Sequence, residues 1–562
     1  MGESSTTITG INFRGNGPKM RFKVSPTGDL YQTRNHTIAA KLINHHFGIY
    51  SGGLASSLDP ERINLNKITD KYGSILNYLG SEGKIDPKAS PKIFGVLFSG
   101  GPAPSANAVI RAIEIKANYY GAKVFAFEDG VVGLLSGQGV FLTPQNVHGI
   151  QRLGGVVIGT ERKNPDEKEL DKIEADFKKW GLSGLILIGG DDTQSTALRL
   201  SARGIPIIGG PKTVDDDLPV TWKTFGAETV VNGSADDMAD MVENDARPMN
   251  RYLIYDVMGR KSGSWTMHAG NAAGVTRTII GEEFTKKGIL ELAEATSKYE
   301  MGKYEMGAQF VLRDVAEVVR IRGEQVPFEQ FVERVRAAED SDIILDPQAL
   351  AAQLARMVRK RALEGLRYGS IAVAEGVADK LIEVTERDEK GNPKKGIIKS
   401  LNNIEVPYDE FGNPNLTGVK FPEKLAKMIK QHPDITSLDP SKKISDFKPF
   451  PIGYQFRGKN PLAYDINMST SLGSAAMELA LNGEFGRMVI LEKNDDVGSI
   501  EFKNIPTHRR NETEHIIPRV VLLNTRFYLS AKEMEYFKQR KWDISGNSSN
   551  SSSGAGNNGK GK

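Results

Sequence analysis

The stretch LILIGGDDTQSTALRLSARGIPIIGGPKTVDDDLP, residues 185–219, decides the fold class. It contains a short apolar run at 185–188, a stretch of helical character at 193–203 and a second apolar run at 205–208. Each run leads into a glycine pair with aspartates close behind it. Short apolar runs that alternate with amphipathic helices are typical of a parallel sheet covered by helices on both faces. The stretch therefore predicts α/β architecture.

The same alternation extends in both directions along the chain. Before this stretch, apolar runs and helices are expected in turn at residues 93–98, 106–120, 124–127 and 166–180. After it, a long helix with an acidic face around 228–245 precedes further apolar runs at 252–257 and 370–374. A second sheet domain is the simplest account of these later runs.

Composition along the chain suggests where the domains begin and end. Residues 1–90 mix glycine, serine and asparagine with scattered apolar residues, which indicates an N-terminal extension. The expected divisions after it are a first α/β domain at 91–227, a second at 228–480 and a C-terminal α/β and helical segment at 481–544. Helical spacing at about 285–365 and loop sequences at about 380–450 predict an inserted, partly helical module in the second domain. Residues 545–562 are too polar to bury a core and are expected to be a disordered tail.

The overall composition excludes several classes of function. Of the 562 residues, 39% are hydrophobic, 25% charged and 8% aromatic, as in a soluble globular protein. The net charge of +3, from 73 basic and 70 acidic residues, is too small to indicate a nucleic-acid or membrane partner. The absence of cysteine excludes disulfides, cysteine-bound zinc, iron–sulfur clusters and a thiol nucleophile. Since no apolar stretch resembles a signal peptide or could span a bilayer, we expect a cytoplasmic protein.

Three glycine-rich turns follow apolar runs, and ligands of open α/β sheets bind just beyond the carboxyl ends of the strands. The first turn is SGGPAPSAN at 99–107, where Gly100 and Gly101 let backbone N–H groups approach an anion at the start of a helix. A tight turn that needs left-handed backbone is the alternative interpretation. The turn is not a Walker A loop, because no GK in the chain is followed by serine or threonine.

The second turn is GGDDT at 189–193. Its adjacent carboxylates, Asp191 and Asp192, suit a magnesium ion that also binds phosphate oxygens. Alternatively, aspartates at the start of a helix are favoured by capping and by the helix dipole alone. From this turn alone, both interpretations remain open.

The third turn is GGPKTVDDDLP at 209–219, in which Lys212 precedes three consecutive aspartates. Clustered like charges repel one another, and a metal–phosphate site would explain their presence. A solvated turn is the alternative. In an extended turn, Asp215 and Asp217 are expected to face the same ligand while Asp216 points away, so that one could act as a base and the other as an electrostatic neighbour.

Taken together, seven motifs resemble the phosphofructokinase family in order and spacing, over residues of about 90–480. They are SGGPAPSAN, GTER at 159–162, GGDDT, PKTVDDD, MGRKSG at 258–263, AEG at 374–376 and GYQFRG at 453–458. The resemblance implies two Rossmann-like three-layer α/β domains with the active site in the cleft between them. It also implies Mg²⁺ and transfer of phosphate to the 1-hydroxyl of fructose 6-phosphate, giving fructose 1,6-bisphosphate.

The resemblance assigns catalytic roles to individual positions of this sequence. Asp215 matches the acid that accepts the proton of the attacking hydroxyl, with Asp217 beside it, and Asp191 matches a metal-associated acid. Gly101 and Arg162 match groups around the transferring phosphate, where positioning and neutralisation of charge do most of the catalytic work.

A further set of residues matches the sugar-phosphate pocket of the family. These are Thr213, Met258, Gly259, Arg260, Glu375, Tyr454 and Arg457. Arg251 matches an arginine that family members lend across a subunit interface. The resemblance therefore implies a homodimer or a larger homo-oligomer with shared active sites.

Two positions resemble the long, pyrophosphate-dependent type of the family. Where ATP users have glycine after GGD, this chain has Asp192, whose side chain would occupy the place of a nucleotide's α-phosphate. Where they commonly have glycine before the TxD motif, it has Lys212, a point charge that suits the terminal phosphates of a compact donor. With pyrophosphate as donor, the reaction would run in both directions, in glycolysis and gluconeogenesis.

Some positions depart from the family pattern. Ser105, Asp216, Pro219 and the pair Thr193 and Gln194 stand where relatives often have other residues, and the first two could weaken donor binding. Two other functions are therefore considered, an ATP-dependent phosphofructokinase and a non-catalytic regulatory subunit. Against the second, the chain retains the residues of the chemistry, namely Asp191, Lys212, Asp215, Asp217 and Arg260.

Overall fold

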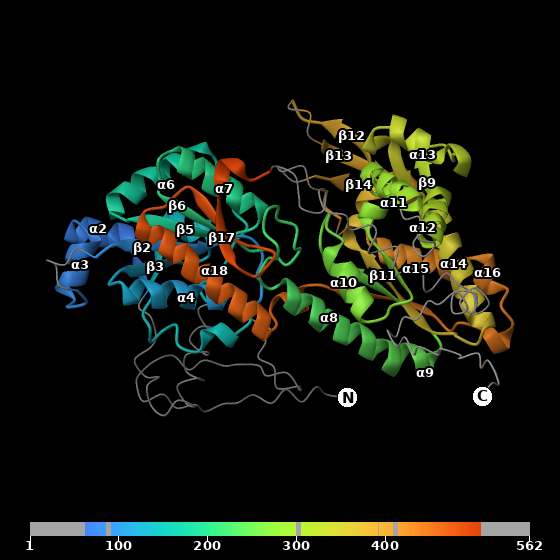
Figure 1. Cartoon of the computed structure of the whole chain (residues 1–562), viewed down its shortest axis with the longest axis horizontal. Coiled ribbons are helices and arrows are strands. Elements are labelled where there is room, and N and C mark those ends of the chain that lie inside the picture. Colours follow the sequence, from blue (N-terminus) through green and yellow to red (C-terminus); the bar gives the residue numbers. More distant parts are fainter. Residues whose placement is uncertain are drawn as a thin grey trace, which may run out of the picture.

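The computed structural model describes residues 62–85, 91–298, 305–389, 391, 393–408, 414–416 and 418–506. These residues form two α/β units that lie next to each other along the long axis of the molecule (Figure 1). The first unit is built on an eight-stranded sheet and the second on a four-stranded sheet. The predicted α/β class is therefore confirmed.

The sheet of the first unit has the strand order β1-β4-β3-β2-β5-β6-β16-β17. The strands from β3 to β16 are parallel to one another, and β1, β4 and β17 make antiparallel pairs at the two edges. The bounds are β1 (Ile63–Asn64), β2 (Ile93–Phe98), β3 (Lys123–Phe127), β4 (Gln138–Phe141), β5 (Gly184–Gly189), β6 (Ile207–Pro211), β16 (Arg487–Leu491) and β17 (Val497–Glu501). Every residue of β2, β5 and β6 is buried, as expected of a parallel sheet with both faces covered.

Helices cover both faces of this sheet because successive side chains of a strand point to opposite sides. Phe94, Val96 and Phe98 of β2 belong to the core that includes α4 and α18, whereas Ile93 and Leu97 belong to the core under α6 and α7. The helices of this unit are α2 (Leu65–Tyr72), α3 (Ile75–Ser81), α4 (Ala106–Tyr119), α5 (Val131–Ser136), α6 (Glu167–Trp180), α7 (Asp191–Ala202) and α18 (Ala463–Asn482). Figure 1 shows α4 and α18 on the side of the sheet opposite to α6 and α7.

The sheet of the second unit is parallel throughout, with the order β15-β7-β11-β8. Its strands are β7 (Tyr252–Val257), β8 (Arg277–Ile279), β11 (Gly369–Ala374) and β15 (Phe447–Ile452). One face packs on α8 (Ala227–Met241) and α10 (Ser264–Ala272) in the same core that contains α4 and α18. The apolar core is thus continuous between the two units.

The opposite face of the second sheet carries the region of the predicted insertion. Its helices are α11 (Lys286–Lys298), α12 (Glu305–Val318), α13 (Phe328–Ala337), α14 (Pro347–Leu363), α15 (Phe421–Gln431) and α16 (Pro433–Thr436). Its small antiparallel sheets are the pair β9 (Val319–Ile321) and β10 (Ile343–Leu345), and the trio β12 (Glu383–Arg387), β13 (Pro393–Ile398) and β14 (Ile404–Pro407). The segment expected to be loops at 380–450 therefore contains strands and helices.

The chain crosses between the units more often than the expected boundaries at 227/228 and 480/481 imply. Helix α18 packs along α4 of the first unit, and β16 pairs with β6 of the first sheet. Asp465 of α18 also accepts hydrogen bonds from the backbone N–H groups of Gly226 (2.9 Å) and Thr229 (2.7 Å) at the start of α8. Residues 62–85 of the expected extension pack on the first sheet as β1, α2 and α3. Composition along the chain does not reveal such returns, because they depend on pairing between distant segments.

Among the described residues, no helix has the length and apolar character needed to cross a membrane. The expected disordered tail at 545–562 lies outside the described residues, as does residue 507 and everything after it.

Candidate active site

Six predicted motifs begin where a strand of one of the two sheets ends. In the first unit these are the turns after β2, β5 and β6, and in the second unit the turns after β7, β11 and β15. The strands concerned are parallel within each sheet, so their carboxyl ends share one edge. Binding at such edges is the rule for open α/β sheets. The turns therefore form two sets, one from each unit.

A cluster of three cations surrounds Gly101 in the first set. The ammonium of Lys212 donates a hydrogen bond to the carbonyl oxygen of Gly101 at 2.5 Å. A methyl group placed on Gly101 would lie 2.8 Å from Nη1 of Arg457 and 3.5 Å from Nη2 of Arg162. A side chain at this position would require the guanidinium of Arg457 to shift. The loop after β2 thus presents its backbone to three positive side chains.

Lys212 is the most perturbed of these cations. Its side chain is buried, and its residue exposure is 3%. Burial, and the positive charges of Arg457 and Arg162, lower the pKa of Lys212 to about 7. Lys212 and Arg457 are buried beside the exposed Arg162, and phosphate oxygens are suited to balance their positive charge.

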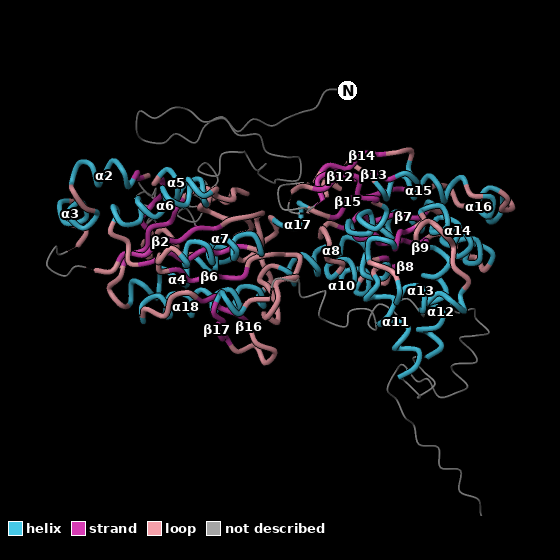
Figure 2. The backbone as a smooth tube through the Cα atoms, turned by 90° about the horizontal axis from the view of Figure 1, so that it is seen from above, coloured by secondary structure: helices cyan, strands magenta, loops and turns pink. Residues whose placement is uncertain are grey.

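Asp215 lies against the same cluster and is held from both units. Its Oδ1 is 3.3 Å from Nη2 of Arg457, which belongs to α17 (Tyr454–Arg457). Figure 2 shows α17 between the two units. The backbone carbonyl of Asp215 accepts a hydrogen bond from Oγ of Ser262 (2.8 Å), in the MGRKSG loop, and its N–H donates to Oγ1 of Thr213 (3.1 Å). The predicted base therefore contacts loops of both sets of turns.

The neighbouring aspartates differ from Asp215 in what they contact. Asp216 is buried with left-handed backbone (φ 50°), and its Oδ1 accepts a hydrogen bond from the N–H of Thr224 at 3.0 Å. Lys223 lies 3.5 Å from its other oxygen. Asp216 thus stabilises the turn, while Asp217 is partly exposed. Since most of this turn is buried, the alternative of a solvated turn is wrong.

For the turn after β5, both interpretations remain open, namely a magnesium site and helix capping. Asp191 and Asp192 are exposed and occupy the first turn of α7, after Gly190 as N-cap. Aspartates there interact favourably with the helix dipole. Among the described residues, no group of three or more acidic or histidine side chains is placed to hold a metal ion. A Mg²⁺ ion that takes one or two carboxylates, with phosphate oxygens and water as its other ligands, still fits Asp191.

In the second set of turns, Glu375 organises the loop that follows β7. Its Oε2 accepts hydrogen bonds from the backbone N–H groups of Arg260 (2.9 Å) and Gly259 (3.3 Å). Arg260 has left-handed backbone (φ 51°), a conformation that these contacts help to hold. Met258 packs on Gly453, where an added methyl would lie 3.2 Å from its Cε. The structure thereby brings together the MGRKSG, AEG and GYQFRG motifs.

Tyr454 and Arg457 follow β15 on the short helix α17. Tyr454 is 65% exposed, and the guanidinium carbon of Arg457 is 5.9 Å from the centre of its ring. Arg457 itself is buried and reaches across to Asp215 and Gly101. The GYQFRG motif therefore supplies one exposed side chain and one buried cation.

Arg251 is the predicted site residue that the chain does not bring to this edge. It precedes β7, whose six residues separate it from Met258 by about 20 Å along the strand. Its guanidinium makes a two-pronged contact with Asp245, with Nε 2.8 Å from Oδ2. A role for Arg251 in the site of a second subunit stays a prediction.

Sequence reasoning missed two groups that shape the site. Ser262 belongs to the motif MGRKSG, but no role was predicted for it, and no role was predicted for Glu282. Glu282 is half-buried, and its Oε1 accepts a hydrogen bond from the N–H of Gly263 at 2.8 Å. Burial raises the pKa of the Glu282 carboxyl. The position of Ser262 inside a functional motif was the signal available for it, whereas none pointed to Glu282.

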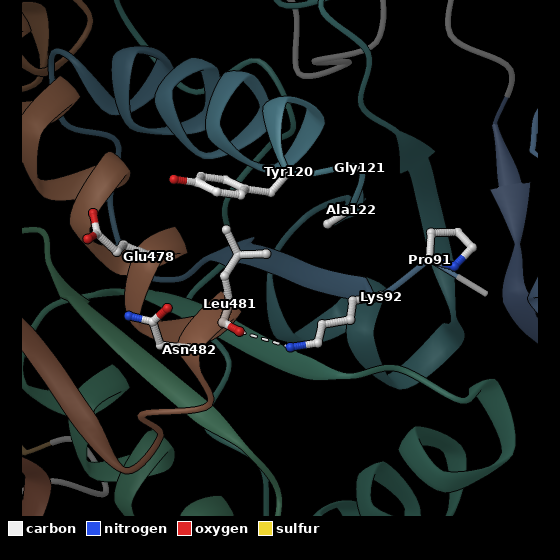
Figure 3. A pocket seen from close by; sticks show the side chains of 8 residues that line it. All are labelled: Pro91, Lys92, Tyr120, Gly121, Ala122, Glu478, Leu481 and Asn482. Carbon is white, nitrogen blue, oxygen red and sulfur yellow. Dashed lines mark hydrogen bonds between the residues drawn. The ribbon is translucent and has the colours of Figure 1, made fainter. Parts of the chain in front are cut away.

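A separate pocket lies at the opposite edge of the first sheet. It has a volume of about 570 Å³ and is lined by residues that precede β2 and β3 and by the end of α18. Figure 3 shows Tyr120, Lys92 and Glu478 around it, with Nζ of Lys92 donating to the carbonyl of Leu481 at 2.8 Å. None of the predicted site residues lines this pocket.

With this geometry described, the chain can be compared with known proteins. Residues 93–344 match the Phosphofructokinase family. ATP-dependent 6-phosphofructokinase 2 of Streptomyces coelicolor is 29% identical over 75% of this chain and 99% of that protein. The pyrophosphate–fructose 6-phosphate 1-phosphotransferase of Amycolatopsis methanolica is 29% identical over 75% of this chain and 98% of that protein.

A solved structure agrees at the level of the fold. The pyrophosphate-dependent phosphofructokinase from Nitrosospira multiformis superposes with a TM-score of 0.50 at 17% identity, covering 75% of this chain and 85% of that one. The chain thus has a phosphofructokinase-type α/β fold. The two relatives matched over almost their whole length carry names for different donors, ATP in one case and pyrophosphate in the other.

Proposed function

We propose that this chain transfers a phosphoryl group from pyrophosphate to the 1-hydroxyl of fructose 6-phosphate, giving fructose 1,6-bisphosphate and phosphate. The observation that carries the proposal is the cluster of Lys212, Arg162 and Arg457 around Gly101, with Asp215 against it. Such a cluster matches the charge of a compact polyanion. Its contact with Asp215 supports a role for this carboxylate as the base that accepts the proton of the acceptor hydroxyl.

In the transfer step, the 1-oxygen of the sugar attacks the terminal phosphorus of the donor. Asp215 takes the proton of that hydroxyl, and the bond between phosphorus and the bridging oxygen breaks to release phosphate. General-base assistance of this kind contributes about 10²- to 10⁴-fold to the rate. Arg457 neutralises charge on the transferred group, and it is close to both the base and the donor loop.

The sugar phosphate is held by the second set of turns. Arg260 and Tyr454 offer a cation and a hydroxyl, and Glu375 fixes the backbone of residues 259–260. Thr213 lies beside Asp215 at the boundary between the two sets. Arg251 would complete the pocket of a second copy of the chain, which makes a homodimer or a larger homo-oligomer the active form.

Asp191 would hold Mg²⁺ against the donor, and Asp217 lies two residues after the base Asp215 as its electrostatic neighbour. Bound Mg²⁺ would neutralise the phosphate oxygens and favour departure of the leaving phosphate. The exposed position of Asp191 at the start of α7 leaves room for the water ligands that this ion retains.

Pyrophosphate is proposed as donor because of Asp192 and Lys212. Asp192 stands exposed beside Asp191, where a third phosphate linked to a nucleoside would meet its negative charge. Lys212 is buried next to Gly101, where its compact ammonium suits the terminal phosphate of a small donor. Because pyrophosphate is a donor of modest driving force, the reaction would run in both directions.

ATP is the second candidate donor, and the naming of several relatives for ATP favours it. The test is coupled turnover of fructose 6-phosphate by the purified chain with Mg²⁺ and either donor at equal concentration. We expect turnover with pyrophosphate and little with ATP. The reverse result would establish an ATP-dependent enzyme, and no turnover with either donor would favour a regulatory subunit.

A further inference from the structure

Gln194 connects the two strands from which the donor loops emerge. It lies in the first turn of α7 and is 4% exposed. Its Nε2 donates one hydrogen bond to the carbonyl of Gly189 at 3.0 Å and another to the carbonyl of Gly210 at 2.8 Å. Gly189 ends β5 and Gly210 is the last residue but one of β6. One side chain thus ties together the ends of two neighbouring strands.

The same ends lead directly into the donor loops. Asp191 and Asp192 follow Gly189 after one residue, and Lys212 follows Gly210 after one residue. The N–H of Lys212 also donates to the carbonyl of Gly189, at 2.9 Å. The carbonyl of Gly189 therefore accepts from Gln194 and from the backbone of Lys212 together. Movement of the Gln194 amide would disturb both loops.

The surroundings of Gln194 are shaped to its side chain. A methyl group placed on Gly209 would lie 2.2 Å from Oε1 of Gln194, so the bare backbone of β6 makes room for the amide. Within the described part of the chain, Oε1 has no hydrogen-bond partner although it is buried. An unsatisfied buried carbonyl costs stability, which an apolar side chain of the same size would avoid. The two hydrogen bonds that Nε2 donates offset this cost.

We propose that Gln194 is a positioning residue for the phosphoryl donor, and this rests on the proposed function. It holds the loop of Asp191 and Asp192 at a fixed distance from the loop of Lys212. The separation of these loops determines whether two linked phosphates can contact both at once. Because the sugar-side turns belong to the other unit, Gln194 controls donor binding and not sugar binding.

The test compares Gln194→Met, which keeps the length of the side chain and removes both donors, with a matched control. Gln353 of α14 is 7% exposed, and its Nε2 donates to the carbonyl of Asp314 at 3.1 Å. Gln353→Met therefore removes a buried amide-to-carbonyl hydrogen bond far from the donor loops. Steady-state kinetics with pyrophosphate and with fructose 6-phosphate would be measured for both variants, together with their melting temperatures.

We expect Gln194→Met to raise KM for pyrophosphate about tenfold and to lower kcat, with KM for fructose 6-phosphate changed less than twofold. Gln353→Met should change neither KM, although both variants lower Tm. If Gln194→Met alters both KM values equally, or neither, Gln194 is a structural residue only. If Gln194→Met fails to fold, Gln194→Asn takes its place, because it keeps a polar side chain that is too short to reach both carbonyls. The test is again whether KM for pyrophosphate rises while KM for fructose 6-phosphate does not.

Failure of this inference is distinguishable from failure of the proposed function. If the unaltered chain uses ATP and not pyrophosphate, the proposed donor is wrong, and the KM for ATP of Gln194→Met tests the positioning role. If the unaltered chain is inactive with both donors, calorimetry of pyrophosphate binding replaces kinetics. Equal binding by the unaltered chain and the variant, or binding by neither, would then overturn the inference.

Discussion

The two units bring opposite kinds of chemistry to the site. On the donor side, a buried ammonium and two guanidinium groups surround the backbone at Gly101, and they repel one another. On the sugar side, the carboxylate of Glu375 is satisfied by the N–H groups of Gly259 and Arg260. Asp215 offsets the charge of Arg457, and a bound anion would offset the positive charge of the other two cations. The sugar side is already balanced before any ligand arrives.

This difference suggests that the donor side mainly supplies affinity for an anion, whereas the sugar side mainly holds its ligand in position. A site with unbalanced charge gains affinity for anions but is sensitive to pH, whereas a balanced site holds its shape over a wide pH range. Arg457 connects the two, because it extends from the second unit to Asp215 and Gly101 of the first. The predictions below test whether the two sides behave as separately as their chemistry implies.

The largest effect is expected from removing the base at the junction. Asp215→Ala should reduce turnover in both directions by about 10²- to 10⁴-fold, because the attacking hydroxyl loses its proton acceptor. Binding of each substrate should remain largely intact, which calorimetry with fructose 6-phosphate measures. Substantial residual turnover would remove Asp215 from the role of base.

The next effect concerns the donor side alone. Lys212→Met should raise KM for pyrophosphate by about 10- to 100-fold, since a charge-assisted hydrogen bond to phosphate is lost. KM for fructose 6-phosphate should change little. An equal rise in both constants would show that the two sides are coupled more tightly than their contacts suggest.

The pH dependence should also differ between the two substrates. The pKa of Lys212 is about 7 in the free protein, below its ordinary value of 10.5, so the ammonium loses its proton as pH rises through 7. Since the protonated form binds the anion, KM for pyrophosphate should rise by up to about tenfold per pH unit above 7. Below pH 7 this contribution should be constant.

Lys212→Met provides the control, because pyrophosphate titrates in the same range. The variant retains the titration of the donor and lacks that of the lysine. The difference between the two profiles therefore isolates Lys212. Identical profiles for the unaltered chain and Lys212→Met would contradict the lowered pKa.

A smaller effect is expected from the balanced side. Glu375→Gln keeps the size of the side chain but removes the charge that the N–H groups of Gly259 and Arg260 face. We expect KM for fructose 6-phosphate to rise about tenfold, with KM for pyrophosphate unchanged. If the donor constant rises instead, Glu375 does not belong to the sugar side.

Local signals explain which parts of this arrangement the sequence predicted. The run at 185–188 lies within β5 (Gly184–Gly189), and the run at 252–257 coincides with β7, because continuous apolar segments are visible within a few residues. The glycine-rich turns were identified for the same reason. The resemblance of motifs then gave the candidate residues an order along the chain.

Contacts between residues far apart in the sequence could not be predicted from such local signals. Arg457 meets Asp215 across 242 positions, and Asp465 caps α8 across more than 230. The double hydrogen bond of Gln194 depends on the pairing of β5 with β6, which no single segment encodes. The return of β16 to the first sheet is of the same kind. Each arises from packing and pairing after the elements have formed.

The smallest effect tests the choice of donor at the edge of the cation cluster. Asp192 is exposed in the first turn of α7, so its negative charge acts through space that solvent partly screens. Asp192→Gly should therefore improve use of ATP relative to pyrophosphate by several-fold at most, measured as the ratio of kcat/KM for the two donors. Asp192→Asn, which keeps the size and removes the charge, separates repulsion from steric exclusion. A ratio unchanged in both variants would mean that donor choice depends on Lys212 and the buried part of the site.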